Sequence, residues 1–173
     1  MAATWGTTEE ERSLAYPCDR WLEQFDAAYF RGVTVDAPPA TLFRWLCQMR
    51  VAPYSYDWID NSGRRSPQTL TPRLDELAIG QRVMIGPLVD FDRDRHLTIL
   101  MRSQMFGDFA TTYLIVPRPC GDCRLLVKVI GKYPKGPTGW LMRMALPWGD
   151  LIMMRRQLLN FKALAEKTAK APT

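Results

Sequence analysis

The strongest constraint on the fold of this chain is a pair of strand-like runs joined by a very short turn. The runs, at 110–117 and 124–133, are rich in β-branched and aromatic residues, which favour strands. Between them lies Cys120-Gly121-Asp122-Cys123, and the pair Gly121-Asp122 is typical of a tight hairpin turn. Because so short a connection joins antiparallel neighbours, we expect an antiparallel sheet built around this hairpin.

Further strands and helices are predicted on both sides of the hairpin. Strand-like runs lie at 28–35, 68–74, 81–89 and 96–104. A helix is predicted to start at Pro38 and Pro39 and to end before Pro53, because its apolar residues recur at helical spacing between these prolines. After the hairpin, a short helical element is predicted at 139–145. Pro147 is then predicted to open a long helix at 148–168, with Asp150 near its positive end.

Length and charge restrict the class of protein. The chain has 173 residues, 47% of them hydrophobic, which fits one domain with one core. The net charge is +5, but the 23 basic residues are spread along the chain, so we expect no nucleic-acid partner. Three consecutive acids at 9–11 do not suit a secretory signal, and a cytoplasmic location is expected. The apolar stretch at 140–154 is too short and too interrupted to span a bilayer, so neither stable membrane insertion nor a lipid-facing anchor is expected.

The four cysteines predict neither disulfides nor a metal site. In a chain without an export signal they should stay reduced. Cys120 and Cys123 have the C-x-x-C spacing, but Cys18, Cys47 and the single histidine, His96, supply no second closely spaced pair of zinc ligands. An acidic turn between two predicted strands fails the EF-hand calcium pattern, because arginine stands where that loop requires glycine. We therefore expect no metal and no cofactor.

The segment 50–67 combines aromatic and charged side chains in a way that suits a ligand site. It carries three aromatic residues, two carboxylates and three guanidinium groups. Tyr56, Asp57 and Arg64 are candidates to orient a ligand by its carboxylate, phenol or carbonyl group. The alternative is that the aromatic residues of this segment only anchor the first helix to the sheet, and that Arg64 lies in a solvated turn.

The order of the elements resembles the START-like or SRPBCC superfamily, which includes polyketide cyclases, Bet v 1-like proteins and lipid-transfer domains. Local signs are the strand at 30–35, the apolar helix residues at 42–46, and Gly80 before a later strand. The resemblance implies an α+β helix-grip fold, in which a curved antiparallel β-sheet wraps around a long C-terminal α-helix and encloses an apolar cavity. It also implies a single START-like ligand-binding domain at 27–170. Residues 1–26 are then an N-terminal extension, which either covers a cavity mouth or contacts a second copy in a homodimer.

Three functions are open for such a fold. The first is binding or transport of a hydrophobic small molecule, a lipid or polyketide-like metabolite, in a cavity to which the nine methionines would give an adaptable lining. The second is an enzyme of the polyketide cyclase, aromatase or dehydratase kind, in which Tyr56, Asp57, His96 or Tyr113 moves a proton and Arg64 stabilises an oxyanion. The third is a protein-interaction module that uses the basic surface and the extension.

The side chains that line the cavity depend on which face of the strands turns inward. Leu97, Ile99 and Met101 form the more apolar face of their strand, which would place Arg102 outside. The predicted ligand-binding residues are Tyr54, Tyr56, Asp57, Trp58, Arg64, Met101, Tyr113 and Met154.

Overall fold

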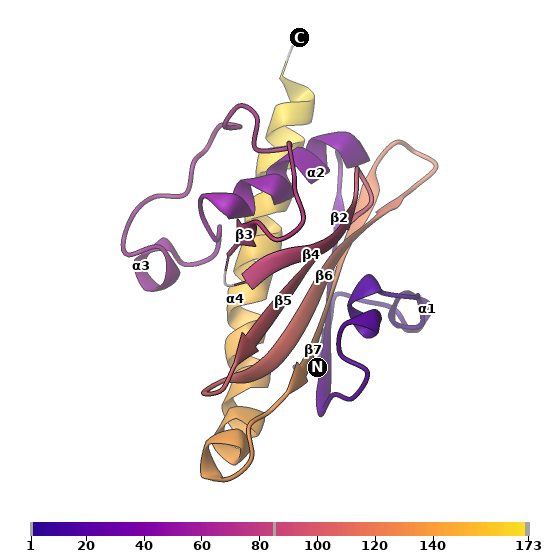
Figure 1. Cartoon of the computed structure of the whole chain (residues 1–173). Coiled ribbons are helices and arrows are strands. Elements are labelled where there is room, and N and C mark those ends of the chain that lie inside the picture. The colour runs from indigo at the N-terminus through magenta and orange to yellow at the C-terminus, as the bar shows by residue number, and fades with distance from the viewer. Residues whose placement is uncertain (1, 85, 172–173) are drawn as a thin grey trace.

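A seven-stranded sheet lies against one long helix in the computed structural model, whose described residues are 2–84 and 86–171 (Figure 1). The strand order is β1-β2-β7-β6-β5-β4-β3, and all neighbours are antiparallel except β1 and β2, which are parallel. The strands are β1 (Thr4–Trp5), β2 (Ala27–Val35), β3 (Arg82–Val83), β4 (Gly86–Asp92), β5 (His96–Ser103), β6 (Gly107–Pro117) and β7 (Cys123–Lys132). The arrangement confirms the α+β class and the helix-grip fold expected from the sequence.

The helices include two that cover one face of the sheet, which we call the inner face. The helical segments are α1 (Glu9–Arg12), η1 (Pro17–Arg20), α2 (Pro39–Cys47), η2 (Gln48–Arg50), α3 (Asp57–Asp60) and α4 (Pro137–Lys170). The segment α2 packs against α4 and the sheet, so Leu42, Phe43 and Leu46 are buried in the main core. A proline occupies the first turn of α2, as expected, because that position needs no N–H donor.

The hairpin β6–β7 forms as the sequence predicts. Its residues pair from Asp108 with Lys132 to Pro117 with Cys123. In the turn, Gly121 has a φ of 83°, a left-handed conformation that glycine adopts without steric cost. Since β7 lies between β6 and β2, this hairpin occupies the middle of the sheet.

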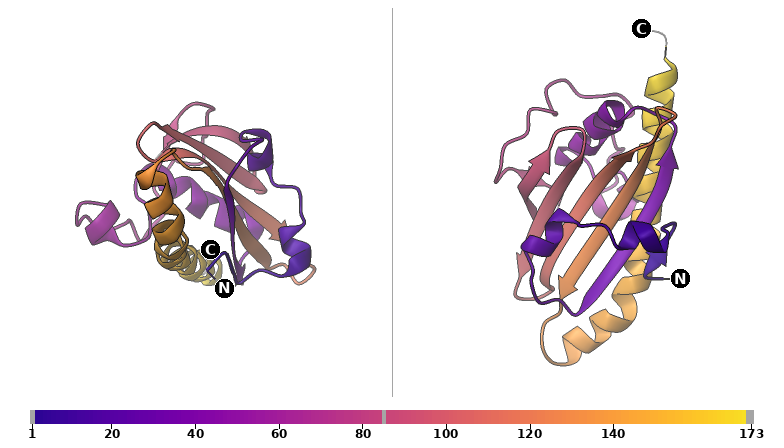
Figure 2. Two further views of the ribbon diagram at one scale, coloured as in Figure 1. Left: turned by 90° about the horizontal axis from the view of Figure 1, so that it is seen from below. Right: turned by 90° about the vertical axis from the view of Figure 1, so that its right-hand side faces the viewer.

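The start of α4 differs from the prediction. The helix begins at Pro137, and Pro147 lies inside it instead of opening it. Proline has no N–H to donate to the carbonyl of Arg143, and its ring crowds that carbonyl, so a helix that continues through a proline bends. Figure 2 shows the first turns of α4, in orange, leaning away from the axis of the later turns. Asp150 consequently lies in the middle of the helix and not near its positive end.

The strand predicted at 68–74 was wrong, because this described segment is a loop. The buried side chain of Gln48 takes the place of a neighbouring strand. It accepts a hydrogen bond from the N–H of Thr71 at 3.1 Å and donates one to the Thr71 carbonyl at 3.4 Å. Pro72 then offers no N–H to a sheet ladder. Tertiary contacts therefore override the local strand propensity here.

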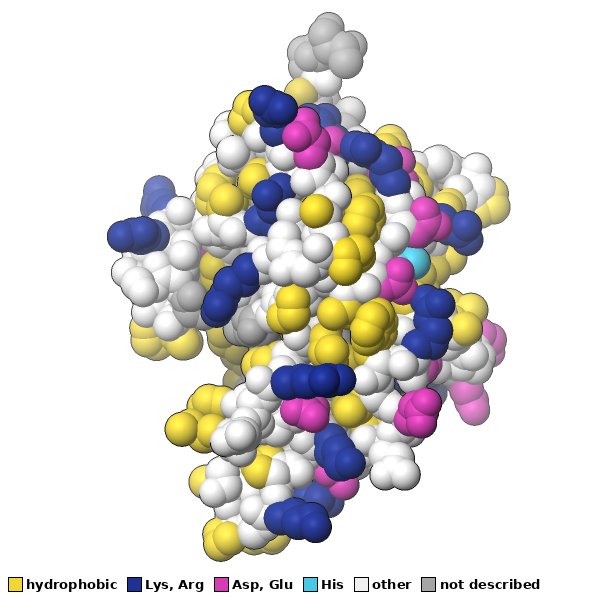
Figure 3. Space-filling model, in the orientation of Figure 1, with side chains coloured by type: hydrophobic (Ala, Val, Ile, Leu, Met, Phe, Trp, Pro, Cys, Tyr) yellow, Lys and Arg dark blue, Asp and Glu magenta, His cyan; other side chains and the backbone are white. Residues whose placement is uncertain are grey.

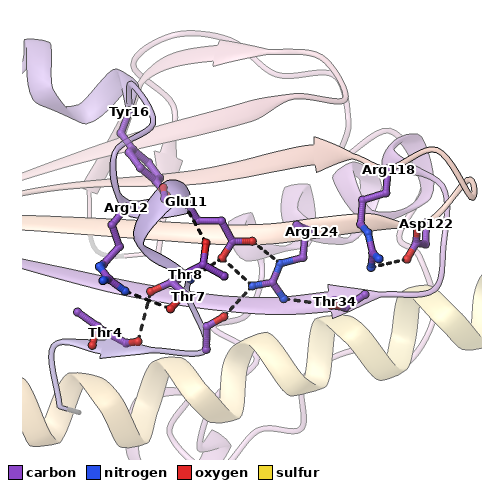
Figure 4. A network of polar contacts seen from close by, with 11 residues as sticks. Thr4, Thr7, Thr8, Glu11, Arg12, Tyr16, Thr34, Arg118, Asp122 and Arg124 are labelled. Atoms are coloured by element: carbon purple, nitrogen blue, oxygen red, sulfur yellow. Dashed lines mark hydrogen bonds and ion pairs between the residues drawn. The ribbon is translucent and has the colours of Figure 1, made fainter.

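The N-terminal residues lie across the outer face of the sheet, opposite α4 (Figure 2). Arg124 on β7 holds this segment in place. Its guanidinium donates to the two carboxylate oxygens of Glu11 at 2.7 and 2.9 Å and to the Gly6 carbonyl at 2.7 Å (Figure 4). Lys128, also on β7, pairs with Asp19 at 2.6 Å. Two salt bridges from the central hairpin thus fasten the segment to the sheet.

Apolar side chains consequently gather on both faces of the sheet. The main cluster lies between the inner face, α2 and α4, and includes Trp45, Leu97 and Phe161. A smaller cluster lies under the N-terminal segment and includes Tyr16 and Leu126. Strand residues alternate between these two clusters, as a two-sided sheet requires.

Candidate functional site

An apolar pocket of about 380 Å³ lies between the inner face of the sheet and the first half of α4. Its volume falls within the usual range of small-molecule sites, roughly 300–1,000 Å³. The residues that line this apolar pocket are Met84, Ile99, Met101, Phe106, Phe109, Thr111, Tyr113, Val129, Met142, Leu146, Asp150 and Met154. The lining is therefore mainly aliphatic and aromatic, with few polar groups.

Strand alternation directs these side chains into the apolar pocket. Ile99 and Met101 on β5 are two residues apart, as are Thr111 and Tyr113 on β6, so each pair shares the inner face. Arg102, which follows the inward Met101, is exposed and does not line the pocket in the described structure. The inward face of β5 is thus its more apolar one.

Gly131 on β7 gives the ring of Phe109 its position at the pocket wall. A Cβ atom at Gly131 would lie 2.3 Å from Phe109 Cε1, a separation that real side chains do not show. The ring also contacts Tyr133 in an edge-on arrangement, with 6.0 Å between ring centroids. Because residue 131 has no side chain, the Phe109 ring lies close against the β7 backbone and leaves the pocket open.

Asp150 on α4 is the one acidic residue that lines the apolar pocket in the described chain. Its Oδ2 accepts a hydrogen bond at 2.6 Å from Nη2 of Arg31 on β2, and the Arg31 side chain is fully buried. Burial raises the pKa of Asp150 to about 6, while the Arg31 guanidinium opposes this rise. The pocket therefore holds a carboxyl group that exchanges its proton under mildly acidic conditions.

Tyr113 and Gln157 form a buried polar link across the interior. The Tyr113 hydroxyl donates to Gln157 Oε1 at 2.6 Å, and Gln157 Nε2 donates to the Pro53 carbonyl at 2.6 Å. The sulfur atoms of Met84 and Met154 each lie 3.8 Å from the Tyr113 hydroxyl oxygen. Burial raises the pKa of Tyr113, and the nearby Asp150 adds to the rise, so the hydroxyl keeps its proton and acts as a donor.

A second hollow of about 400 Å³ adjoins the apolar pocket, and we call it the side hollow. It is lined by Arg50, Val51, Ala52, Pro53, Ser55, Arg82, Met84, Met153, Met154 and Gln157. Met84 and Met154 line both spaces. The first residues of the segment 50–67 thus border the interior, whereas its charged residues at 57 and 64 do not line either space.

Four predicted site residues meet in a different place, a polar cleft of about 700 Å³ beside the second half of α4. The cleft is lined by Tyr54, Ser55, Tyr56, Asp57, Trp58, Arg65, Ser66, Gln68, Arg156, Asn160, Ala163, Leu164 and Lys167. Asp57 accepts hydrogen bonds from the N–H and the hydroxyl of Ser66 at 2.8 and 2.5 Å, so its carboxylate fixes the loop. Tyr54 is buried, and its ring lies 5.1 Å from that of Phe161 between centroids.

The structure therefore divides the predicted ligand-binding residues. Met101, Tyr113 and Met154 line the apolar pocket, whereas Tyr54, Tyr56, Asp57 and Trp58 line the polar cleft. Arg64 is exposed and lines neither space in the described residues. A ligand-binding role for each of these eight residues stays a prediction.

The sequence interpretation missed the ion pair between Asp150 and Arg31. These residues are 119 positions apart, and the Asp150 carboxylate was interpreted as a helix-terminal charge. A signal was present, because an arginine in the middle of the apolar strand at 28–35 needs a buried acidic partner. The position of Asp150, between apolar helix residues, offered that partner.

The remaining candidates for chemistry lie outside the apolar pocket. His96 stands at the start of β5, with Nε2 3.5 Å from Asp90 Oδ2. The Sγ of Cys123 donates to the Ala37 carbonyl at 3.3 Å. Within 2–84 and 86–171, no three His, Cys, Asp or Glu side chains are grouped to hold a metal ion. No helix of the described residues has both the length and the apolar character to cross a membrane.

Comparison with known proteins gives matches among solved structures. No protein-family model matches the chain, and no curated protein sequence does. Protein TTHA0849 from Thermus thermophilus is 12% identical with a TM-score of 0.55, and the match covers 83% of this chain and 100% of that one. Protein MLL2253 from Mesorhizobium loti is 15% identical with a TM-score of 0.51, over 82% of this chain and 98% of that one.

A further match is the di-domain ARO/CYC StfQ from the steffimycin biosynthetic pathway. It is 12% identical with a TM-score of 0.52, and the match covers 83% of this chain and 52% of that one. The chain thus shares a helix-grip fold with these solved structures. The resemblance seen in the sequence is thereby confirmed at the level of the fold.

Proposed function

We propose that this SRPBCC-fold protein binds an apolar small molecule in the apolar pocket, with a hydroxyl or amine group of that molecule placed at Asp150. The supporting observation is a pocket of about 380 Å³ whose lining is apolar except for Thr111, Tyr113 and Asp150. Apolar walls favour a ligand by removing its surface from water, and a single polar group fixes its orientation.

The state of Asp150 supports a ligand that donates a hydrogen bond. A carboxylate buried in an apolar environment is destabilised unless hydrogen bonds compensate for its lost hydration. Arg31 supplies one such bond, to Oδ2. A ligand hydroxyl or amine would supply another and would lower the pKa of Asp150 from its raised value of about 6.

The methionines support a ligand class whose members vary in shape. Met84, Met101, Met142 and Met154 line the apolar pocket, and unbranched thioether side chains adapt to different surfaces. Met84 and Met154 also separate the apolar pocket from the side hollow. A longer molecule would displace these two side chains and extend into the second space.

A pocket-filling variant tests the proposed function. Thr111→Phe places a ring in the apolar pocket, whereas Val116→Phe adds the same ring on the outer side of the same strand, in the cluster under the N-terminal segment. Titration with the neutral apolar fluorophore Nile red should give saturable binding that Thr111→Phe weakens about tenfold or more. Val116→Phe should bind like the wild type. Equal affinities of all three proteins would contradict the proposal, as would a consistent failure of native mass spectrometry to detect any co-purified or added apolar ligand.

A proton-transfer enzyme of the cyclase, aromatase or dehydratase kind is the second candidate, and the raised pKa of Asp150 is the observation that favours it. A carboxyl group with a pKa near 6 can act as either acid or base at cellular pH. Asp150→Asn separates the candidates once a ligand is known. Lost turnover with retained ligand binding would favour the enzyme, whereas weakened binding with no turnover in either protein would favour the carrier.

A further inference from the structure

The first half of α4 exposes an unusual number of large apolar side chains. Trp140 is 66% exposed and Trp148 61%. The turn between β5 and β6 adds Met105, which is 67% exposed, and Phe106. We call these residues the apolar end, and its members are Trp140, Leu141, Met144, Trp148, Met105 and Phe106. Patches of this kind on a folded protein usually mark a surface that contacts something apolar.

The helical members of the apolar end lie on one side of α4. With about 100° of rotation per residue, positions 140, 141, 144 and 148 fall within a sector of about 100°. Ile152, also exposed, extends this stripe by one turn. Met142, Leu146 and Asp150 point the other way, into the apolar pocket. The first half of α4 therefore has two apolar sides, one facing the pocket and the other facing outward.

Basic residues surround the apolar end. The chain carries no acidic residue from 123 to 149, whereas Lys132, Lys135 and Arg143 are exposed there. Arg102 is exposed on the neighbouring strand. Asp26 and Asp108 offset part of this charge: Asp26 pairs with Arg143 at 3.2 Å, and Asp108 stands between Arg102 and Lys132 in the sheet. These four cations outnumber the two anions, which leaves a positive rim beside the apolar side chains. Figure 3 shows hydrophobic side chains at the lower end of the molecule, with basic side chains and some acidic ones among them.

We propose that the apolar end docks on the surface of a membrane that contains anionic lipids. Tryptophan is favoured at the boundary between headgroups and acyl chains, because its ring is apolar while its N–H stays hydrated. Leucine, methionine and phenylalanine side chains gain from entering the acyl region, and basic residues at the rim are attracted to anionic headgroups. The surface lies on the membrane and does not cross it. This departs from the sequence expectation that the stretch 140–154 is not a lipid-facing anchor.

The apolar pocket and the apolar end share a residue. Phe106 both lines the apolar pocket and is 52% exposed at the apolar end. Met142 and Leu146 line the pocket from the helix that carries Trp140 and Trp148. A docked molecule would thus present its pocket opening to the acyl region, and an apolar ligand would pass between the two without entering water. The docking itself does not depend on the proposed function, since the exposed side chains and the charges would act with an empty pocket.

A second copy of the chain fits this surface less well than a membrane does. In a symmetric dimer the same patch faces itself, so the positive rims of both copies would come together. An anionic lipid surface offers the opposite charge over its whole area. Self-association is nevertheless an outcome that the experiment distinguishes.

Vesicle binding of the full chain tests the proposal. Wild-type protein should sediment with vesicles of phosphatidylcholine and phosphatidylglycerol, less with phosphatidylcholine alone, and less again at high salt. The double variant Trp140→Ser/Trp148→Ser should weaken binding to the anionic vesicles by about tenfold or more, because two interfacial anchors are lost. A matched control is Ile59→Ser/Ile79→Ser, which removes two exposed apolar side chains outside the apolar end, in α3 and in the loop before β3, and should bind as the wild type does.

Two further measurements make the result decisive. Thr111→Phe should keep vesicle binding even if it abolishes Nile red binding, which separates this proposal from the proposed function. Circular dichroism should show that the double variant folds, as expected for exposed positions. The proposal fails if wild-type protein does not bind anionic vesicles, or if the control pair weakens binding as much as the test pair. A dimer in light scattering that becomes a monomer in the Trp140→Ser/Trp148→Ser variant, without vesicle binding, would also overturn it in favour of self-association.

Discussion

The two halves of α4 carry large apolar side chains but use them differently. Residues 137–150 contribute one buried position, Gly139, and expose several of their apolar side chains. Residues 151–170 bury Met154, Leu158 and Phe161 against α2 and the sheet. The second half of this continuous helix thus completes the core. The first half leaves a pocket between itself and the sheet, and it exposes apolar side chains on its outward side. The bend at Pro147 lies near the end of the first half.

An apolar side chain on α4 is therefore not necessarily a buried one. The second half meets α2 as well as the sheet, so most of its apolar side chains are enclosed, although Ile152 and Leu159 stay exposed. The first half has the apolar pocket on its inward side. Apolar residues that the fold does not need for its core can be retained for contact with a ligand or a membrane.

The largest expected effect separates the halves by stability. Phe161→Ala should lower the free energy of unfolding by about 3–5 kcal/mol, because it removes a fully buried ring from the core. Trp140→Ala, in the exposed half, should change it by no more than about 0.5 kcal/mol. Urea denaturation followed by circular dichroism measures both. Similar costs for the two substitutions would remove the distinction between the halves.

The pH dependence of stability should differ in sign between carboxyl groups of the two halves. The pKa of Asp150 is raised from 3.8 to about 6 on folding, so its contribution is fully present below pH 3.8 and is lost as the pH rises through about 6. Wild-type stability relative to Asp150→Asn should therefore fall by on the order of 2 kcal/mol between pH 4 and pH 6.5.

Glu166 supplies the matched control in the second half. Burial opposes the change, but the hydrogen bond from Lys162 lowers the pKa of Glu166 below its ordinary value of 4.5. Its contribution is present above that value and is lost as the pH falls, so wild-type stability relative to Glu166→Gln should rise with pH over the acidic range. Slopes of the same sign for both variants would show that Asp150 is paired as an ordinary carboxylate.

The smallest expected effect concerns the hydrogen bond that joins the second half of α4 to β6. Tyr113→Phe removes the hydroxyl that donates to Gln157 at 2.6 Å and should cost about 1–2 kcal/mol, since the buried amide oxygen loses its partner. Tyr54→Phe is the control, because the buried hydroxyl of Tyr54 has no hydrogen-bond partner among the described residues. This second substitution should be neutral or slightly stabilising in the same urea assay. A larger loss for Tyr54→Phe would exclude the Tyr113–Gln157 link as a specific contribution.

The sequence allowed the central sheet and the fold to be predicted, because these depend on local signals. The short connection at 118–122, with glycine at 121, favours an antiparallel hairpin. The sequence did not determine which strand face lines the cavity, and the structure places Met101 and Tyr113 on the same, inward face. Element order then sufficed for the helix-grip resemblance. Side chains in the segment 50–67 were harder to place, since their direction depends on how the loop packs. The structure turns most of them to the polar cleft.

The chemistry of the apolar pocket depends on contacts between distant parts of the chain. Arg31 and Asp150 meet because β2 and α4 pack together, so the local pattern at each position indicates only that it needs a partner and not which residue that partner is. The start of α4 was misplaced for a related reason. Pro147 satisfies the local rule for a helix start, but the helix already begins ten residues earlier, at Pro137. Its first turn packs closely on the chain before it because Gly139 has no side chain, and a Cβ there would lie 1.8 Å from the Pro134 carbonyl oxygen.

The two outermost strands of the sheet, β1 and β3, are each two residues long. A strand at the margin of an open sheet exposes unpaired backbone N–H and C=O groups, which can recruit a strand from another molecule. Such short margins offer a neighbouring chain too few groups to build a stable ladder. The sheet can therefore remain open around its helix, as a ligand pocket requires, without becoming a template for aggregation.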